Sequence, residues 1–260
     1  MSPHEKLVQK RFSNAARGYE EAASIQTGIA ADLLGRITLP AADGVVVDIG
    51  CGTGSLITQV KELRRDITAI GLDLAPGMLQ HAARHKNITL IEADAARLPF
   101  LPDSIDLAVS SSTYQWVTDL PGAFCEVARA LKPNGHFVAA LFGRETLCEF
   151  FTSLAAAKRL QGKQLASLRR LPSEGDVRQA LHAAGFVHAG AHAEIHTAVF
   201  KDVLSLLRWV KAIGANALAQ DVFLGSHALK EAEIIYRRHY ASNEGLQATF
   251  EVIWIEAVKG

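Results

Sequence analysis

The residues with the clearest chemical signal form a glycine-rich segment, Val47-Asp48-Ile49-Gly50-Cys51-Gly52-Thr53-Gly54. An apolar run precedes it and a helical pattern follows it, so we expect a strand-to-helix turn where backbone can approach a ligand closely. The spacing G-x-G-x-G differs from the dinucleotide fingerprint G-x-G-x-x-G, and no Lys-Ser/Thr pair follows as in a P-loop. Because Asp48 would repel a phosphate, the segment favours a cationic ligand. The alternative is a tight turn that binds nothing.

Two further carboxylates, Asp73 and Asp94, end the next two predicted strands. A carboxylate at the position of Asp73 can accept hydrogen bonds from both hydroxyls of a ribose, and Asp94 can accept one from an adenine amino group. A single Asp in such a place is commonly a helix cap. Together with Asp48, however, these residues would meet in one crevice at the carboxyl edge of a parallel sheet. The three acids therefore predict a ligand site.

Strand and helix patterns alternate around these acids. Short apolar or alternating runs predict about seven strands, at 45–50, 67–73, 87–94, 104–111, 136–143, 186–199 and 247–258. Helical spacing predicts helices at 4–36 with a candidate break at Gly18, and at 54–64, 76–85, 119–131, 145–170, 173–184, 200–214 and 226–240. This alternation is typical of an α/β fold with a doubly wound, mostly parallel sheet and right-handed crossovers. The helices at 145–170 and 200–240 exceed what a minimal sheet of this kind needs.

The composition excludes several classes of protein. The 260 residues carry 27 Lys+Arg and 27 Asp+Glu, and 49% are hydrophobic, which argues against wholesale disorder and against nucleic-acid binding through a general basic field. Charges and prolines interrupt every apolar run before 18 residues, so we expect no membrane span. The N-terminal segment lacks the apolar core of a secretory leader. These features predict a cytoplasmic protein, and we expect it to be a monomer.

Metal binding is not expected. The three cysteines, Cys51, Cys125 and Cys148, are too scattered for a zinc site or a disulfide framework. His188, His192 and His196 could chelate an ion on a helix, but the segment reads as a strand, on which they would lie too far apart.

Residues 44–142 resemble the class I S-adenosylmethionine-dependent methyltransferases. The resemblance is carried by VVDIGCGTG, LDLAPGML, EADAARLPF, SIDLAVSSSTYQW and LKPNGHFV. It implies a Rossmann-like sheet whose last strand is antiparallel, with S-adenosyl-L-methionine as cofactor and S-adenosyl-L-homocysteine as product. It also implies a set of cofactor-binding positions: Asp48, Ser110 and Ser111 at the methionine end, Gly50, Cys51 and Gly52 in the loop, Asp73 at the ribose, and Leu74, Met78, Asp94 and Ala95 around the adenine.

The flanking segments extend the resemblance to nearly the whole chain. RFSNAARGYEEAASIQ, LLRWVKAIGAN and ATFEVIWIEAVKG are similar to segments of the malonyl-acyl-carrier-protein O-methyltransferases of biotin synthesis. The resemblance implies methyl-ester formation on the free carboxylate of a malonyl thioester, the ester that primes pimeloyl formation. Such a carboxylate is already ionised at pH 7, so no general base is expected. Open alternatives are methylation of a quinone or a free carboxylic acid, cofactor binding without transfer, and, disfavoured by the glycine spacing, a nicotinamide dehydrogenase.

We expect acceptor-binding residues in these flanks. Arg208, with Lys211 on the same helical face, is the candidate for holding the carboxylate, although a surface pairing with Asp202 or packing on Trp209 would explain it equally simply. Three further side chains are expected at the acceptor. Tyr19, which lies with Phe12 in the N-terminal segment, would close the site over the methyl group or simply pack in the core. Gln115 and Trp116 follow the fourth strand at the crevice, where Trp116 would wall the acceptor pocket.

The resemblance also implies an acidic acyl carrier protein as partner. The segment 158–170 contains five cations and no acid, and we expect it to be either a carrier-docking surface or a solvated helical face; its cations are Lys158, Arg159, Lys163, Arg169 and Arg170. The expected organisation is a single methyltransferase domain, 1–260. It comprises an N-terminal helical cap at 1–40, a cofactor-binding core at 44–142, and acceptor-side helices at 145–170 and 200–240.

Overall fold

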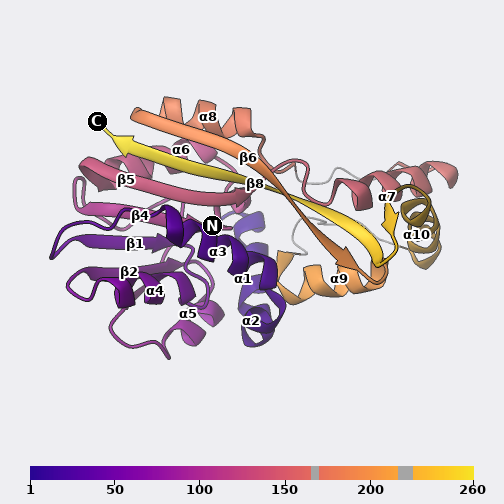
Figure 1. Cartoon of the computed structure of the whole chain (residues 1–260), viewed down its shortest axis with the longest axis horizontal. Coiled ribbons are helices and arrows are strands. Elements are labelled where there is room, and N and C mark those ends of the chain that lie inside the picture. The colour runs from indigo at the N-terminus through magenta and orange to yellow at the C-terminus, as the bar shows by residue number, and fades with distance from the viewer. Residues whose placement is uncertain (165–169, 216–224) are drawn as a thin grey trace.

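A twisted, mostly parallel sheet runs the length of the molecule (Figure 1). The computed structural model describes residues 1–164, 170–215 and 225–260. The principal strands lie in the order β3-β2-β1-β4-β5-β8-β6, and only β8 is antiparallel to its neighbours along this path. The bounds are β1 (Val45–Ile49), β2 (Thr68–Asp73), β3 (Thr89–Glu92), β4 (Ile105–Ser111), β5 (Leu131–Phe142), β6 (Phe186–Phe200), β8 (Gly245–Lys259) and, paired with β8 alone, the two-residue β7 (Ala241–Ser242). The seven-stranded, doubly wound fold with an antiparallel last strand is thus confirmed.

Helices cover both faces of the sheet. One face packs against α3 (Ser24–Arg36) and α4 (Ser55–Leu63), and the other against α6 (Leu120–Ala130) and α8 (Glu174–Ala183). The remaining helices are α1 (Pro3–Ala15), α2 (Tyr19–Ala22), α5 (Pro76–Ala82), α7 (Cys148–Leu160), α9 (Val203–Ala212) and α10 (Ser226–Tyr240), with short 3-10 turns at Ala16–Gly18 and Tyr114–Trp116.

The strands feed two separate cores because their side chains alternate. In β1, Val46 joins the core under α3 and α4, whereas Val47 joins the core under α6 and α8. The same alternation divides β8. Trp254 contributes to the first core and Ile253 to the second, and both are essentially inaccessible.

Three local predictions need correction. The predicted helix 4–36 is broken into α1, a 3-10 turn, α2 and α3, with the break at Gly18 among them. The strand predicted at 136–143 begins earlier, at Leu131, so β5 includes residues 132–135, where an irregular register against β4 and a left-handed Asn134 accommodate the extra residues. The third strand ends at Glu92, so Asp94 lies in the loop beyond it. Propensity alone does not show that a turn-like sequence will be absorbed as a bulge.

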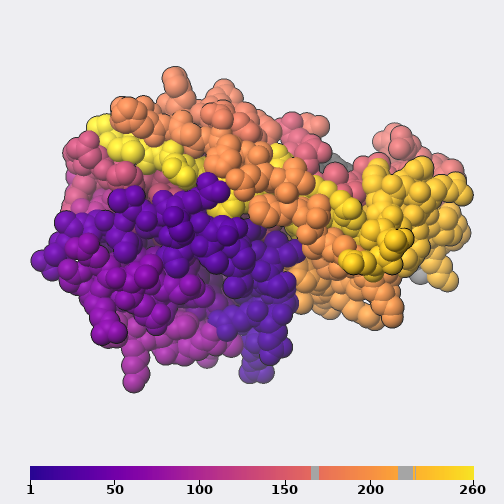
Figure 2. Space-filling view, viewed as in Figure 1, coloured from indigo at the N-terminus to yellow at the C-terminus, as the bar shows by residue number. Residues whose placement is uncertain are grey.

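The last two long strands extend beyond the rest of the sheet. Pairing of β5 with β8 ends at Phe142 and Val252, while β8 continues to pair with β6 as far as Leu246 and Phe200. Helices α7 and α10 pack together and against this extension of β8, and α9 contacts β6. Figure 2 shows this end projecting from the main body. No helix in the described ranges is both long and apolar enough to cross a membrane.

Candidate functional site

The glycine-rich loop folds over the carboxyl end of β2. Gly50, Gly52 and Gly54 have φ values of 77°, 54° and 82°, which favour glycine strongly. The backbone N–H groups of Gly50 and Cys51 donate to the Leu72 carbonyl at 2.6 and 2.9 Å. The loop therefore follows a fixed path that places its backbone at the edge of the sheet.

The Asp73 carboxylate holds the glycine-rich loop in place by hydrogen bonds to backbone N–H groups. Its Oδ2 accepts a hydrogen bond from the Gly52 N–H at 2.8 Å, and its Oδ1 accepts one from the Ala75 N–H at 2.7 Å. Burial raises the pKa of Asp73, although these backbone donors oppose the effect. Each carboxylate oxygen can accept a further bond, so Asp73 can hold the loop and a ribose hydroxyl together. Asp94 is similarly placed: its Oδ1 accepts from the Ala96 N–H at 2.9 Å.

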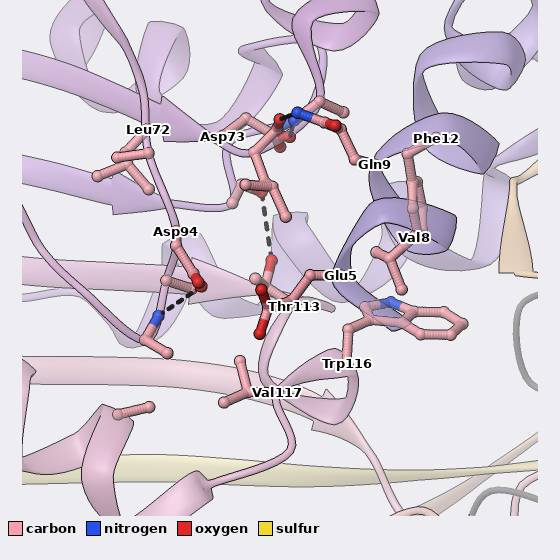
Figure 3. A pocket seen from close by; sticks show the side chains of 18 of the residues that line it. Glu5, Val8, Gln9, Phe12, Leu72, Asp73, Asp94, Thr113, Trp116 and Val117 are labelled. Carbon is pink, nitrogen blue, oxygen red and sulfur yellow. Dashed lines mark hydrogen bonds between the residues drawn. The ribbon is translucent and has the colours of Figure 1, made fainter. Parts of the chain in front are cut away.

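A cavity with a volume of about 340 Å³ lies beside these residues (Figure 3). Of the residues expected at the cofactor, eight line it: Gly50, Gly52, Asp73, Leu74, Met78, Asp94, Ala95 and Ser111. Among the described lining residues, four are acidic and one is a cation: Glu5, Asp73, Asp94 and Asp119 against Arg97. A glycine cradle with an acidic wall suits a nucleoside that carries positive charge, and these residues fit S-adenosylmethionine.

Three expected cofactor contacts are not on the cavity wall. Asp48 and Ser110 lie within β1 and β4, so their side chains point into the packed faces of the sheet rather than past its edge. The Ser110 hydroxyl donates to the Ile49 carbonyl at 2.7 Å. The Cys51 side chain is buried and packs closely against Gly71 of β2. These three residues are therefore not part of the described cavity wall, and a direct contact between them and the cofactor remains a prediction.

Asp48 is a buried carboxyl with unusual electrostatics. It is 1% exposed, and its Oδ2 has no hydrogen-bond partner. Burial, reinforced by the charge of Asp73, raises the pKa of Asp48 to about 8, while the backbone amide of Ile57 opposes the rise. Burial and the same two acids raise the pKa of the Cys51 thiol. This raised pKa favours the protonated form of Asp48 at neutral pH.

We expect Asp48→Asn to remove one pH dependence of stability. With its pKa raised, the folded state holds the Asp48 proton between about pH 4 and pH 8 while the unfolded state loses it, so the free energy of unfolding falls as pH rises through this window. The loss is about 1.4 kcal/mol for each pH unit at most. Urea unfolding should show the wild type losing stability relative to Asp48→Asn between pH 5 and pH 8. A constant difference would contradict the raised pKa.

A second, smaller cavity of about 40 Å³ adjoins the first. The two share Phe12, Tyr19, Ser112 and Trp116. The rest of its described wall comes from the N-terminal helices, the loops after β4 and β5, α9 and β8, and is mostly apolar: Gln26, Gln115, Phe142, Thr146, Leu147, Leu171, Trp209, Val210, Ile213, Ala215 and Phe250. Three of the five residues expected at the acceptor, Tyr19, Gln115 and Trp116, therefore line it.

Arg208 and Lys211 are placed differently from the expectation. Both are exposed, whereas α9 turns Trp209, Val210 and Ile213 towards the second cavity. The shared face of the two cations was predicted correctly, but that face looks to solvent. Arg208 instead contributes to lowering the pKa of Asp202, together with the stronger hydrogen bonds of Ser205. This placement corrects the expectation that they line the cavity.

Several lining residues were not identified from the sequence. Glu5, Val8 and Gln9 of α1 lie beside Phe12 on one side of the first cavity (Figure 3). The Gln9 amide donates to the Leu74 carbonyl at 3.0 Å, which ties α1 to the loop after β2. The helical spacing of these positions could have indicated a common face, but their mixed polarity hides an amphipathic pattern.

The remaining candidates lie away from both cavities. Lys158 and Arg159 end α7, Lys163 and Arg170 are exposed, and Arg169 lies outside the described residues. His192 pairs with Glu194 at 3.1 Å. In the parts of the chain that the structure describes, no three His, Cys, Asp or Glu side chains come together as a metal site.

Comparison with known proteins agrees with this geometry. Residues 47–139 match the family model described as "Methyltransferase domain". A malonyl-[acyl-carrier protein] O-methyltransferase of Methylovorus sp. is 32% identical over 97% of this chain and 88% of its own length. The biotin biosynthesis bifunctional protein BioHC of Saccharophagus degradans is 34% identical over 97% of this chain, which spans 46% of that longer protein.

Solved structures show the same fold. YcgJ of Bacillus subtilis superposes with a TM-score of 0.61 at 18% identity, covering 88% of this chain and 98% of its own. Geranyl diphosphate C-methyltransferase of Streptomyces coelicolor, solved with S-adenosyl-L-homocysteine, has a TM-score of 0.59 at 14% identity and covers 98% of each chain. From its relatives and the glycine loop with its acidic cavity, we conclude that this chain belongs to the class I S-adenosylmethionine-dependent methyltransferases.

Proposed function

We propose that this methyltransferase acts on the free carboxylate of a malonyl thioester carried by an acyl carrier protein. The observation that supports the proposal most strongly is the second cavity. It is small and mostly apolar, and it shares lining residues with the first cavity, where the cofactor is proposed to bind. The similarity to malonyl-[acyl-carrier protein] O-methyltransferases over nearly the whole chain points to the same acceptor.

The proposed reaction requires placement rather than proton transfer. S-adenosylmethionine supplies a sulfonium-bound methyl group when it is bound. The acceptor carboxylate oxygen forms a bond to the methyl carbon while the carbon–sulfur bond breaks, and that bond's electron pair stays on sulfur. No proton is released, so no general base is needed. Since opposite charges are neutralised, a dry and weakly polar surrounding favours the transition state over the charged reactants.

The chain's own residues supply this surrounding. Phe12 and Trp116 pack edge to face with ring centroids 5.4 Å apart, and both border the two cavities. Tyr19 lies at the same junction, and burial, with the charge of Asp73 added, raises its pKa. It therefore stays neutral at physiological pH. We propose that these three rings exclude water from the transferred methyl group.

We further propose that the cations in the last turn of α7 and in the segment that follows it bind the acidic acyl carrier protein. In the described part of this region Arg159, Lys163 and Arg170 are exposed. We expect Arg159→Glu with Arg170→Glu to raise the KM for malonyl carrier protein about tenfold at low salt, because like charges would now face each other. The effect should shrink in 0.5 M salt, as screening shortens the range of the interaction.

Two comparisons isolate this docking effect. Malonyl-pantetheine lacks the carrier, so its KM should not change in the double variant. Arg65→Glu reverses an exposed charge between α4 and β2, away from both cavities, and should leave both acceptors unaffected. An equal loss on carrier-bound and free thioester would contradict docking at this surface.

The test of the function itself is methyl transfer to a defined acceptor. Purified enzyme with labelled S-adenosylmethionine should place label on malonyl carrier protein as a methyl ester that mild base removes. Label on a quinone or on a free carboxylic acid, with none on the malonyl thioester, would favour the alternative acceptors.

A further inference from the structure

The junction of the two cavities contains hydrogen-bond donors that the protein itself does not use. Ser112 Oγ and Trp116 Nε1 are both buried and have no partner, and both residues line both cavities. Unpaired buried donors are uncommon because each carries a desolvation penalty. Such a pair at a ligand site is therefore explained if a bound acceptor completes the hydrogen bonds.

The backbone at Ser112 is held in an unfavourable conformation. Its φ is 58°, in the left-handed region that costs a non-glycine residue conformational energy. The Ser112 N–H donates to the Ala140 carbonyl at 2.8 Å, and the Gln115 amide donates to the Ser112 carbonyl at 2.6 Å. Gln115 is in turn held by the Phe142 N–H at 3.4 Å. Neighbouring strand β5 thus keeps Ser112 at the junction.

The second cavity offers no charged partner to a carboxylate. None of its described lining residues is Lys, Arg, His, Asp or Glu. Two other polar groups of its wall are engaged within the protein: the Thr146 hydroxyl donates to the Glu251 carbonyl, and the Trp209 indole N–H donates to the Ala22 carbonyl.

We propose that the Ser112 hydroxyl and the Trp116 indole N–H hold the acceptor carboxylate in place of a cationic side chain. This inference rests on the proposed function and deepens it. Figure 3 shows the Trp116 ring beside Val8 and Phe12 of α1, and the Phe12 ring packs edge to face on it. Two neutral donors orient the carboxylate without the strong ground-state stabilisation of an ion pair, so its oxygen stays nucleophilic.

The test measures acceptor KM in variants that remove one donor each. Trp116→Phe keeps an aromatic ring and loses the N–H, and Ser112→Ala loses the hydroxyl. Each should raise the KM for malonyl thioester about tenfold or more, as expected for a lost hydrogen bond to a charged group. The dissociation constant of S-adenosylhomocysteine, measured by calorimetry, should stay within about twofold of the wild type.

The variant Ser112→Gly distinguishes a contact between Ser112 and the acceptor from a purely structural role of Ser112. Glycine relieves the left-handed strain, so this variant should resist urea better than Ser112→Ala while showing the same raised KM. Ser153→Ala is the matched control, because Ser153 Oγ is also buried and unpaired but lies on neither cavity. It should leave KM unchanged.

The results separate a failure of the two assigned donors from a failure of the proposed function. If the wild type methylates malonyl thioester and KM is unchanged in Trp116→Phe and both Ser112 variants, the assigned donors are wrong. They are also wrong if Arg208→Ala alone raises KM. If the wild type places no label on malonyl thioester, the proposed function fails and this inference fails with it.

Discussion

Asp73→Ala is expected to abolish measurable cofactor binding while the protein remains folded. The carboxylate accepts the N–H groups of Gly52 and Ala75 and borders the cofactor cavity. Its loss removes the bonds to these two backbone groups and, with them, the proposed acceptor for the ribose hydroxyls. Hydrogen bonds to a charged group are worth about 1.5–3 kcal/mol each, so calorimetry with S-adenosylhomocysteine should show an affinity at least 100-fold weaker, of the order expected from two such bonds.

Two comparisons sharpen this prediction. Asp73→Asn should be intermediate, because its amide oxygen can accept one bond while its NH₂ group faces a backbone donor. Asp66→Ala removes an exposed carboxylate that pairs with Arg64 outside the cavity and should leave affinity unchanged. Wild-type affinity in Asp73→Ala would exclude Asp73 from the cofactor site.

Gly50→Ala is expected to lose both stability and cofactor binding. At φ 77° an alanine is strained, and its Cβ would overlap the Thr113 side chain, lying 2.7 Å from Thr113 Cβ. Left-handed strain costs about 1–2 kcal/mol, and the overlap must add to it by moving the loop. Urea unfolding and calorimetry should both record the loss.

Two other glycines, Gly28 and Gly52, serve as controls, because alanine at these positions should affect stability and cofactor binding differently. Gly28 lies in α3 with open space around its Cβ position, so Gly28→Ala should raise the free energy of unfolding by up to about 1 kcal/mol. Gly52 has open space but a φ of 54° and borders the cavity. Gly52→Ala should therefore weaken cofactor binding more than it weakens folding. Full cofactor affinity in Gly50→Ala would contradict the proposed role of the loop.

Local chemistry made the cofactor half of the molecule predictable. Buried β-branched runs identify the parallel strands, and the acids Asp73 and Asp94 follow from their position near strand ends. The capping box of Ser173 with Asp176 and the left-handed Gly185 bound α8 close to the predicted range 173–184. Each signal depends on neighbours within a few residues, so no long-range packing was needed to read it.

The acceptor half depends on contacts between distant segments. Whether a helical cation such as Arg208 faces solvent or a cavity is decided by what packs on the opposite side of α9, and there Trp209 donates to the Ala22 carbonyl at 2.9 Å across 187 residues. Ser112 and Trp116 likewise share the walls of both cavities with Phe12 and Tyr19, which come from the distant N-terminal segment. Spacing along the chain cannot show these meetings.

The carboxylate of a malonyl thioester is the proposed methyl acceptor. The most direct measurement incubates the full chain with methyl-labelled S-adenosylmethionine and an equimolar mixture of malonyl carrier protein, a free dicarboxylic acid and a quinone, then separates the products. We expect the label on the malonyl carrier protein as a methyl ester, which mild base removes. Base-stable label on the quinone, or label on the free acid with none on the malonyl thioester, would contradict it.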